Sequence, residues 1–288
     1  MNSLTVLKRK STLSAFALLV SGVMLAPGAQ AQTIPLADGN SLATVNLGGG
    51  SGAVGMNSWL INGQSQLSQQ WFWYRVGTTP QASIDTISLA TVNSVSANFL
   101  SATYTDANHR FSINVSYFLQ GGTPGTWNSD MSESISVANL TGAPLDFHFF
   151  QYSDFDLAGS NLGDQVSISK NLGPPVSYWR ALQTKANTPT QLAETMDLPF
   201  ADHAEAAIAG ATLASLNGGP YTLNDNLTAG PGDVTWAFEW DTSIAANSSL
   251  DIIKDKKLEV APIPEPATLG LLSLGLIALA LRRQRATA

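Results

Sequence analysis

The 288-residue chain contains no cysteine and only three histidines, and charged residues make up just 12% of it. Without cysteine the protein has no disulfide, thiolate metal site or thiol nucleophile, so its stability must come from an ordinary hydrophobic core. The histidines are His109, His148 and His203. No two are spaced to place both imidazoles on one element, which argues against a histidine-based zinc site.

Positive charge is scarce in the central part of the chain. Six of the 14 Lys and Arg lie in the terminal segments, at residues 8–10 and 282–285. Eight basic residues then stand against 20 acidic ones once Glu265 is set aside, a net charge of about −12. Such an acidic protein is not expected to bind nucleic acid or an anionic membrane surface, and it suits solubility outside the cell.

Residues 1–31 have the three regions of a secretory signal peptide. A basic stretch at 8–10 precedes an apolar run at 13–25, and Ala29 and Ala31 form a small-x-small cleavage site. We therefore expect cleavage after Ala31 and export of the chain that begins at Gln32.

The carboxyl end carries a second apolar segment, at residues 267–281, followed by Arg282, Arg283 and Arg285. Fifteen helical residues rise about 22 Å, against a hydrocarbon core of about 30 Å. Flanking arginines can snorkel, and a short helix can thin the bilayer, so the segment can still span. We expect a transmembrane helix with its arginines in the cytoplasm, which holds the exported chain transiently in the inner membrane.

Together, Pro264-Glu265-Pro266, the apolar helix and the arginine cluster with Arg282 and Arg283 resemble the PEP-CTERM sorting signal. The resemblance implies processing near the motif by an exosortase, a membrane-embedded transpeptidase of Gram-negative bacteria that make exopolysaccharide. It implies an exported protein that ends at the cell surface or in the extracellular matrix.

Between the two ends, residues 32–258 are predicted to form one all-β domain, an antiparallel β-sandwich with one short helical insertion. A linker at 259–266 joins this domain to the sorting helix and tail at 267–288. Alternating strands and turns predict hairpins over 96–119 and 134–152. Residues 233–241 form the last strong strand, before a polar stretch at 250–258. An alanine-rich helix is expected over 201–216, where Asn-Gly-Gly ends it.

An acidic, glycine-containing loop lies at residues 153–165. Asp154, Asp156, Asn161 and Asp164 could supply oxygen ligands to Ca²⁺, although the EF-hand pattern is incomplete. The competing interpretation is an acidic turn whose carboxylates bind backbone amides. Asp154 and Asp156 share a strand face, so they could also be paired catalytic carboxylates of a glycosidase.

Trp71 and Trp73 lie on one face of an aromatic strand at 71–74. An exposed pair of indoles would form a stacking platform for a glycan, whereas burial would make them part of the sandwich core.

The sequence contains no serine-hydrolase, nucleotide-binding or zinc-protease motif that is placed in the structural context such a motif requires. We therefore expect a non-enzymatic exported protein that associates with exopolysaccharide or the biofilm matrix and has no cofactor apart from the candidate Ca²⁺. The alternative is a secreted glycan-acting hydrolase with its acidic site near Asp154 and Asp156.

Overall fold

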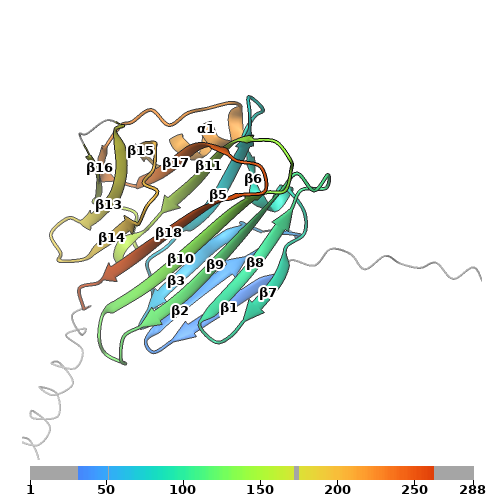
Figure 1. Cartoon of the computed structure of the whole chain (residues 1–288). Helices are drawn as coiled ribbons and strands as arrows, with labels where there is room; N and C mark the ends of the chain where they lie inside the picture. Colours follow the sequence, from blue (N-terminus) through green and yellow to red (C-terminus); the bar gives the residue numbers. More distant parts are fainter. Residues whose placement is uncertain (1–31, 51, 172–174, 263–288) are drawn as a thin grey trace, which may run out of the picture.

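The computed structural model describes residues 32–50, 52–171 and 175–262, which form two antiparallel β-sheets packed face to face (Figure 1). Short runs of β-branched and aromatic residues separated by turn residues favour this architecture. The predicted all-β sandwich with one helix is confirmed. The predicted signal peptide and sorting helix lie outside the described residues.

Sheet A has the strand order β1-β2-β3-β5-β11-β17-β15, and two short strands extend it, β4 beside β3 and β6 beside β5. Its strands are β1 (Thr33–Asp38), β2 (Ser41–Asn46), β3 (Gly55–Ile61), β4 (Gln64–Ser65), β5 (Gln69–Val76), β6 (Ala82–Ser83), β11 (Leu145–Asp154), β15 (His203–Ile208) and β17 (Val234–Ile244).

Sheet B has the order β16-β12-β13-β14-β18-β10-β9-β8-β7. Its strands are β7 (Thr91–Val95), β8 (Phe99–Thr105), β9 (Phe111–Gly121), β10 (Asn128–Asn139), β12 (Asp164–Asn171), β13 (Ser177–Lys185), β14 (Gln191–Met196), β16 (Thr228–Gly232) and β18 (Ser249–Glu259). The helical elements among the described residues are the 3₁₀ turns η1 (Ile84–Thr86) and η2 (Leu157–Gly159) and the helix α1 (Ala211–Gly218).

Aromatic rings fill the space between the sheets. Phe72 on β5 stacks on Phe149 of β11, with ring centroids 5.4 Å apart, and approaches Tyr117 of sheet B. The interior also encloses a group of four charged side chains that contact one another, Glu133, Glu194, Lys254 and Lys256. Gln151 on β11 and Trp236 on β17 both donate to Glu194 of β14, which fixes the face of each strand that points toward sheet B.

One of the two predicted hairpins is confirmed. Strands β8 and β9 pair directly on either side of a turn in which Arg110 forms an ion pair with Asp106. The second prediction is wrong, because β10 belongs to sheet B whereas β11 belongs to sheet A. The turn between them passes from one layer to the other, and the Asn139 side chain donates to the carbonyls of Ala143 and Ile244 there. Alternation identifies the buried face of a strand but not its partner.

Two further expectations need correction. The first part of the predicted helix is strand β15, which pairs with β17, and α1 begins only at Ala211 after the left-handed Gly210. The polar stretch at 250–258 is part of β18, a strand in the middle of sheet B. It was missed because its inward positions include Lys254 and Lys256 while Ile253 is half-exposed.

Candidate active site

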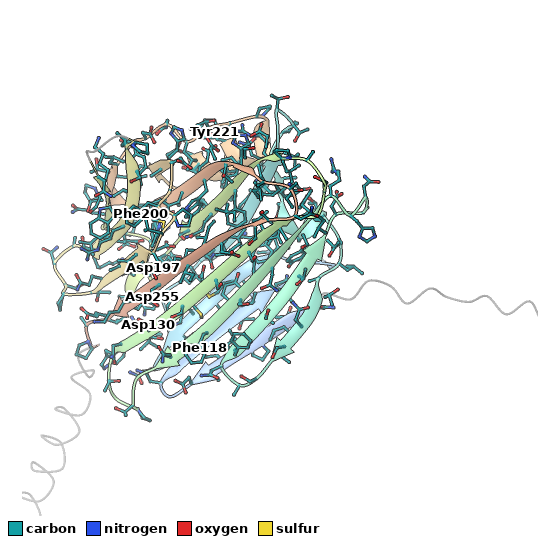
Figure 2. All side chains as sticks on the ribbon, in the orientation of Figure 1. Phe118, Asp130, Asp197, Phe200, Tyr221 and Asp255 are labelled. Carbon is teal, nitrogen blue, oxygen red and sulfur yellow. The ribbon has the colours of Figure 1, made fainter. Side chains whose placement is uncertain are left out.

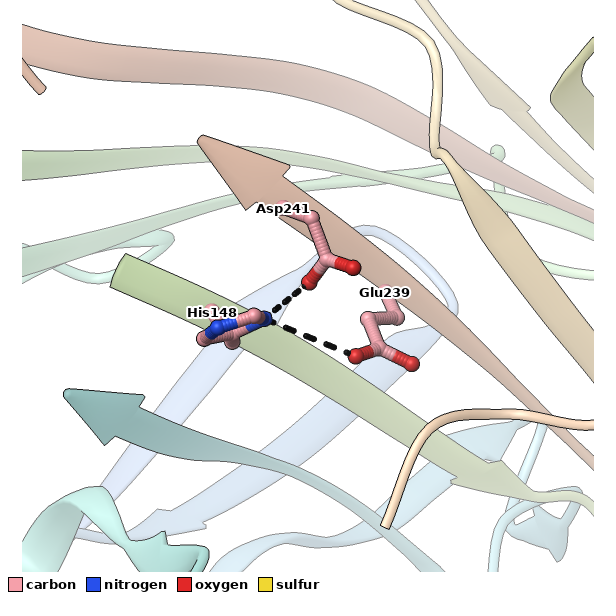
Figure 3. Close-up of side chains that lie close together, drawn as sticks. All are labelled: His148, Glu239 and Asp241. Carbon is pink, nitrogen blue, oxygen red and sulfur yellow. Dashed lines mark hydrogen bonds and ion pairs between the residues drawn. The ribbon is translucent and has the colours of Figure 1, made fainter. Parts of the chain in front are cut away.

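A cluster of polar side chains lies on the face of sheet A that points away from sheet B. His148 on β11 pairs in register with Asp241 on β17 and with Arg75 on β5, and Glu239 is two residues before Asp241 on the same face. Figure 3 shows His148 directed toward both carboxylates. We call His148, Glu239, Asp241 and Arg75 the acid–base cluster.

One imidazole nitrogen is the centre of this cluster. His148 Nδ1 lies 2.8 Å from Arg75 Nη2 and 3.8 Å from Glu239 Oε1, and it contacts Asp241 Oδ1 at hydrogen-bond range. Arg75 Nη2 is also 3.5 Å from Glu239 Oε1. A guanidinium so close to the ring nitrogen opposes binding of a metal ion there, although the His148, Glu239 and Asp241 ligand atoms are close enough together to hold one.

Glu239 is the carboxyl group most altered by its surroundings. Burial raises its pKa to about 8 and nearby Asp241 adds to this, while the Leu223 amide, which donates to Glu239 Oε2 at 2.8 Å, and Arg75 oppose it. Near neutral pH this carboxyl therefore holds a proton. An acid with a pKa near the working pH, next to an imidazole, is the combination that general acid–base catalysis uses.

Access to the cluster is graded. The Glu239 side chain is fully buried, whereas His148, Asp241 and His203 are 16%, 29% and 34% exposed. His203 Nε2 lies 3.9 Å from Asp241 Oδ2, so two of the three histidines meet here through strand pairing and not through sequence spacing. His148, Asp241 and His203 therefore reach solvent, whereas Glu239 does not.

The segment at 219–227 closes one side of the cluster. The backbone carbonyl of Tyr221 accepts a hydrogen bond from Arg75 Nη1 at 3.3 Å. The phenolic hydroxyl of Tyr221 donates to buried Glu205 on β15. Asp225 contacts His203 at 3.1 Å. Figure 2 shows Tyr221 at the α1 end of the molecule. These bonds hold Arg75 and His203 in place around the exposed edge of His148.

The structure brings some residues of the predicted acidic site together and adds one carboxylate that was not predicted. Asp154 and Asp156 lie together, and Asp233, just before β17, joins them, with one oxygen of each within 4.8 Å of the others. Asn161 donates to Asp233 Oδ2 at 3.1 Å. Burial, with the charges of Asp156 and Asp233, raises the pKa of Asp154 to about 7.

Asp164 does not belong to this group. It is fully buried, 3.1 Å from Lys185 Nζ, and accepts from the Leu157 amide and from Gln183. Asp164 therefore neutralises a lysine and caps η2, as the competing interpretation of an acidic turn predicts.

Trp71 and Trp73 are buried, at 0% and 3% exposure. Trp71 donates to Ser83 on β6, and Trp73 donates to Asn217 on α1. These bonds fix the rings beneath chain segments that follow in the sequence, so the structure forms no open indole platform at these two positions. The core interpretation is the one it supports.

The remaining predicted positions lie outside the described residues: the cleavage residues Ala29 and Ala31 and the sorting residues Pro264, Glu265, Pro266, Arg282 and Arg283. Within the described ranges, no helix is long and apolar enough to cross a bilayer.

None of the four residues of the acid–base cluster was singled out from the sequence. Arg75, His148 and Glu239 are separated by 70 residues or more, and only the pairing of three strands brings them together. The sequence feature that could have indicated the cluster is the presence of ionisable residues within otherwise aromatic strands, as in DFHFFQ at 146–151 and FEWD at 238–241. In a strand that is buried on both faces, an ionisable side chain is tolerated only where it has a hydrogen-bond or ion-pair partner.

The family of PEP-CTERM protein-sorting motifs matches residues 262–285. The chain thus contains the sorting motif of exported proteins that exosortases process at the membrane, as the sequence predicted. No curated protein matches the sequence.

Solved structures share the fold at very low sequence identity. A protein from Escherichia coli K12 described as a candidate aldose 1-epimerase is 8% identical, with 81% of this chain and 100% of that chain covered and a TM-score of 0.56. A galactose mutarotase related enzyme from Lactobacillus acidophilus is also 8% identical, with 80% and 100% covered and a TM-score of 0.54. A bacterial glucoamylase bound to acarbose is 12% identical, with 86% of this chain but only 35% of that chain covered and a TM-score of 0.55.

The described residues therefore share the β-sandwich fold of these structures. This likeness corrects the expectation of a non-enzymatic matrix protein, because the similar structures are described as carbohydrate-active enzymes or their homologues. The finding favours the class of the alternative, a glycan-acting enzyme, but does not test hydrolysis or the site near Asp154 and Asp156.

Proposed function

We propose that the β-sandwich is a carbohydrate-active enzyme that interconverts the two anomers of a reducing sugar. The observation that carries the proposal is the acid–base cluster, which offers a proton acceptor and a proton donor side by side on the accessible face of sheet A. The fold likeness to an epimerase and to mutarotase-related proteins supports the same class of reaction.

The reaction needs two proton transfers at neighbouring oxygens. A base removes the proton of the anomeric hydroxyl while an acid protonates the ring oxygen, and the bond between the anomeric carbon and the ring oxygen breaks. Rotation of the open-chain aldehyde and reversal of both transfers give the other anomer. Because both oxygens are bonded to one carbon, the donor and acceptor must be neighbours, as His148 and Asp241 are.

Each residue then has a role that matches its exposure. Asp241 accepts the proton of the anomeric hydroxyl, and His148 donates to the ring oxygen. Buried Glu239, with its pKa of about 8, lies 3.8 Å from the imidazole, acts on it electrostatically and does not touch the sugar. Arg75 positions both Glu239 and His148.

A hydrolase centred on Asp154 and Asp156 is less well supported. Glycosidases place two carboxyl groups across a cleft, about 5–5.5 Å or 6.5–9.5 Å apart. Here one oxygen of each aspartate lies within 4.8 Å of the others and of Asp233, so the carboxylates converge at one point and do not face each other across a cleft.

The test is anomer interconversion by the purified protein, followed by polarimetry or exchange NMR on a panel of aldoses. His148→Asn should lower the rate by about 10²–10⁴-fold, the usual contribution of a general acid. His109→Asn is the matched control, because His109 lies in an exposed turn with a left-handed backbone that Asn tolerates. The proposal fails if the wild type accelerates no aldose over buffer, or if both histidine variants have equal rates.

We further propose that this enzyme is released or displayed at the cell surface after cleavage near Pro264–Pro266, where exopolysaccharide fragments would supply reducing sugars. Epitopes placed after Gln32 and after Ala288 distinguish the outcomes in fractionated cells. The first epitope should appear outside the inner membrane without the second. If both remain together in the inner membrane, the tail is a permanent anchor.

A further inference from the structure

The acidic group at the far end of β11 is separate from the acid–base cluster. Asp154 lies six residues along the strand from His148, about 20 Å away at the usual rise. Asp156 follows in the loop to η2, and Asp233 precedes β17. Their carboxylates converge from three segments, with one oxygen of each within 4.8 Å of the others.

A buried hydroxyl without a hydrogen-bond partner lies on the strand next to this group. Thr235 is fully buried, and its Oγ1 has no partner among the described residues. Thr235 pairs in register with Asp154 across the β11–β17 ladder, so these two side chains leave the same face of sheet A, and Asp233 immediately precedes the strand. Asp154 Oδ1 is likewise buried without a partner. An orphaned hydroxyl beside three carboxylates is the arrangement that a bound cation would satisfy.

The nearest lysine does not neutralise the group by ion pairing. Lys185 Nζ lies 3.1 Å from Asp164 Oδ1 and also donates to the Ser160 carbonyl. Among the described residues, no lysine, arginine or histidine forms an ion pair with Asp154, Asp156 or Asp233. The group therefore carries negative charge that no ion pair among the described residues balances, although Lys185 acts on Asp156 at longer range.

We propose that Asp154, Asp156 and Asp233 bind a hard divalent cation, Ca²⁺, with the Thr235 hydroxyl and the Asn161 side chain completing the protein ligands. Calcium binds oxygen atoms at about 2.3–2.6 Å, so ligand oxygens up to about 5 Å apart fit around one ion. The spacing of the three carboxylates lies within this limit. Bound Ca²⁺ would fasten the end of β11, the loop at 155–163 and the start of β17 to one another.

The experiment measures Ca²⁺ binding by isothermal titration calorimetry, and thermal unfolding with and without chelator, on the purified full chain. We expect one site with a dissociation constant at or below about 1 mM, as for extracellular calcium modules, and weaker binding of Mg²⁺. The melting temperature should rise with added Ca²⁺, because an ion that binds only the folded state stabilises it.

Asp233→Asn gives the sharpest test, because its effect should change sign with the cation. In chelator, removing one of three like charges should leave the melting temperature equal to or above that of the wild type. In excess Ca²⁺ the variant should melt below the wild type, since it has lost a ligand. Asp251→Asn, at an exposed position of β18, is the control and should respond to Ca²⁺ as the wild type does.

The proposal is overturned if the wild type binds no Ca²⁺ at 10 mM, a concentration about tenfold above the weakest affinity expected. It is also overturned if Asp233→Asn binds with unchanged affinity. Either result would leave the acid–base proposal intact, because anomer interconversion is measured separately and depends on other residues.

Discussion

Replacing Lys256 with methionine should destabilise the protein severely, because Lys256 belongs to a charged quartet inside the sandwich. Its ammonium lies 2.7 Å from Glu133 Oε1 and 3.2 Å from Glu194 Oε1, and Lys254 contacts the same two carboxylates. All four side chains are essentially unexposed. The two lysines balance the two glutamates, so the quartet is neutral as a whole.

The size of the effect follows from what remains after the substitution. Burial favours neutral carboxyls, yet Lys256 and Lys254 hold the pKa of Glu194 at about 2. Without Lys256, two carboxylates share one ammonium in the buried interior. Breaking a buried ion pair in this way costs about 3–5 kcal/mol. Changing Lys256 to Met together with Glu194 to Gln restores neutrality, so the double variant should lose less stability than the two single variants added together.

Urea unfolding followed by tryptophan fluorescence measures this cost, and Trp236, which donates to Glu194 at 2.9 Å, is a nearby reporter. Lys257→Met is the control, because Lys257 points to the outer face of the same strand and is 57% exposed. The loss in Lys256→Met should shrink as pH falls, since protonation of a carboxylate removes the unbalanced charge. Equal free energies of unfolding for Lys256→Met and Lys257→Met would refute the reasoning.

Two further predictions concern other buried polar groups. The pKa of Glu239 is about 8 in the folded state and about 4.3 in the unfolded state. Protonated Glu239 therefore contributes its full stabilisation below pH 4.3, and this contribution is lost as the pH rises through 8. Glutamine does not titrate, so between pH 5 and pH 9 the melting temperature of Glu239→Gln should fall less than that of the wild type. Asn139→Ala should cost about 2 kcal/mol in urea unfolding, since the carbonyls of Ala143, Ile244 and Ala245 lose a buried donor. A loss below 0.5 kcal/mol, the size of a typical surface change, would show that the turn does not depend on this amide.

The all-β class was predictable because it depends on local pattern alone. In β9, Phe111, Ile113 and Val115 alternate with polar residues, and the structure buries these three. The same alternation did not predict strand β18, because two of its inward-facing residues are lysines. Their burial depends on Glu133 and Glu194, which lie on other strands, and a sequence pattern carries no information about such partners.

The two candidate sites were predictable to different degrees, because a sequence pattern groups neighbouring residues but not residues on separate strands. Asp154 and Asp156 are neighbours in sequence, so their carboxylates could be grouped before any fold was known. Asp233 lies 77 residues further along the chain from Asp156 and joins them only through the pairing of β11 with β17. His148 and Asp241 depend on that ladder entirely.

One strand pairing therefore sets both proposed sites. The antiparallel register of β11 and β17 places His148 opposite Asp241 near one end and Asp154 opposite Thr235 near the other. A slip of one residue in β11 would turn His148 toward sheet B and carry Asp154 away from Thr235, because neighbouring strand residues point to opposite faces. A cation held by Asp154 and Asp233 would oppose that slip by tying the two strands together at one end. The calcium site would then act on the acid–base cluster by holding the register in which His148 and Asp241 meet, although no ligand is shared between them.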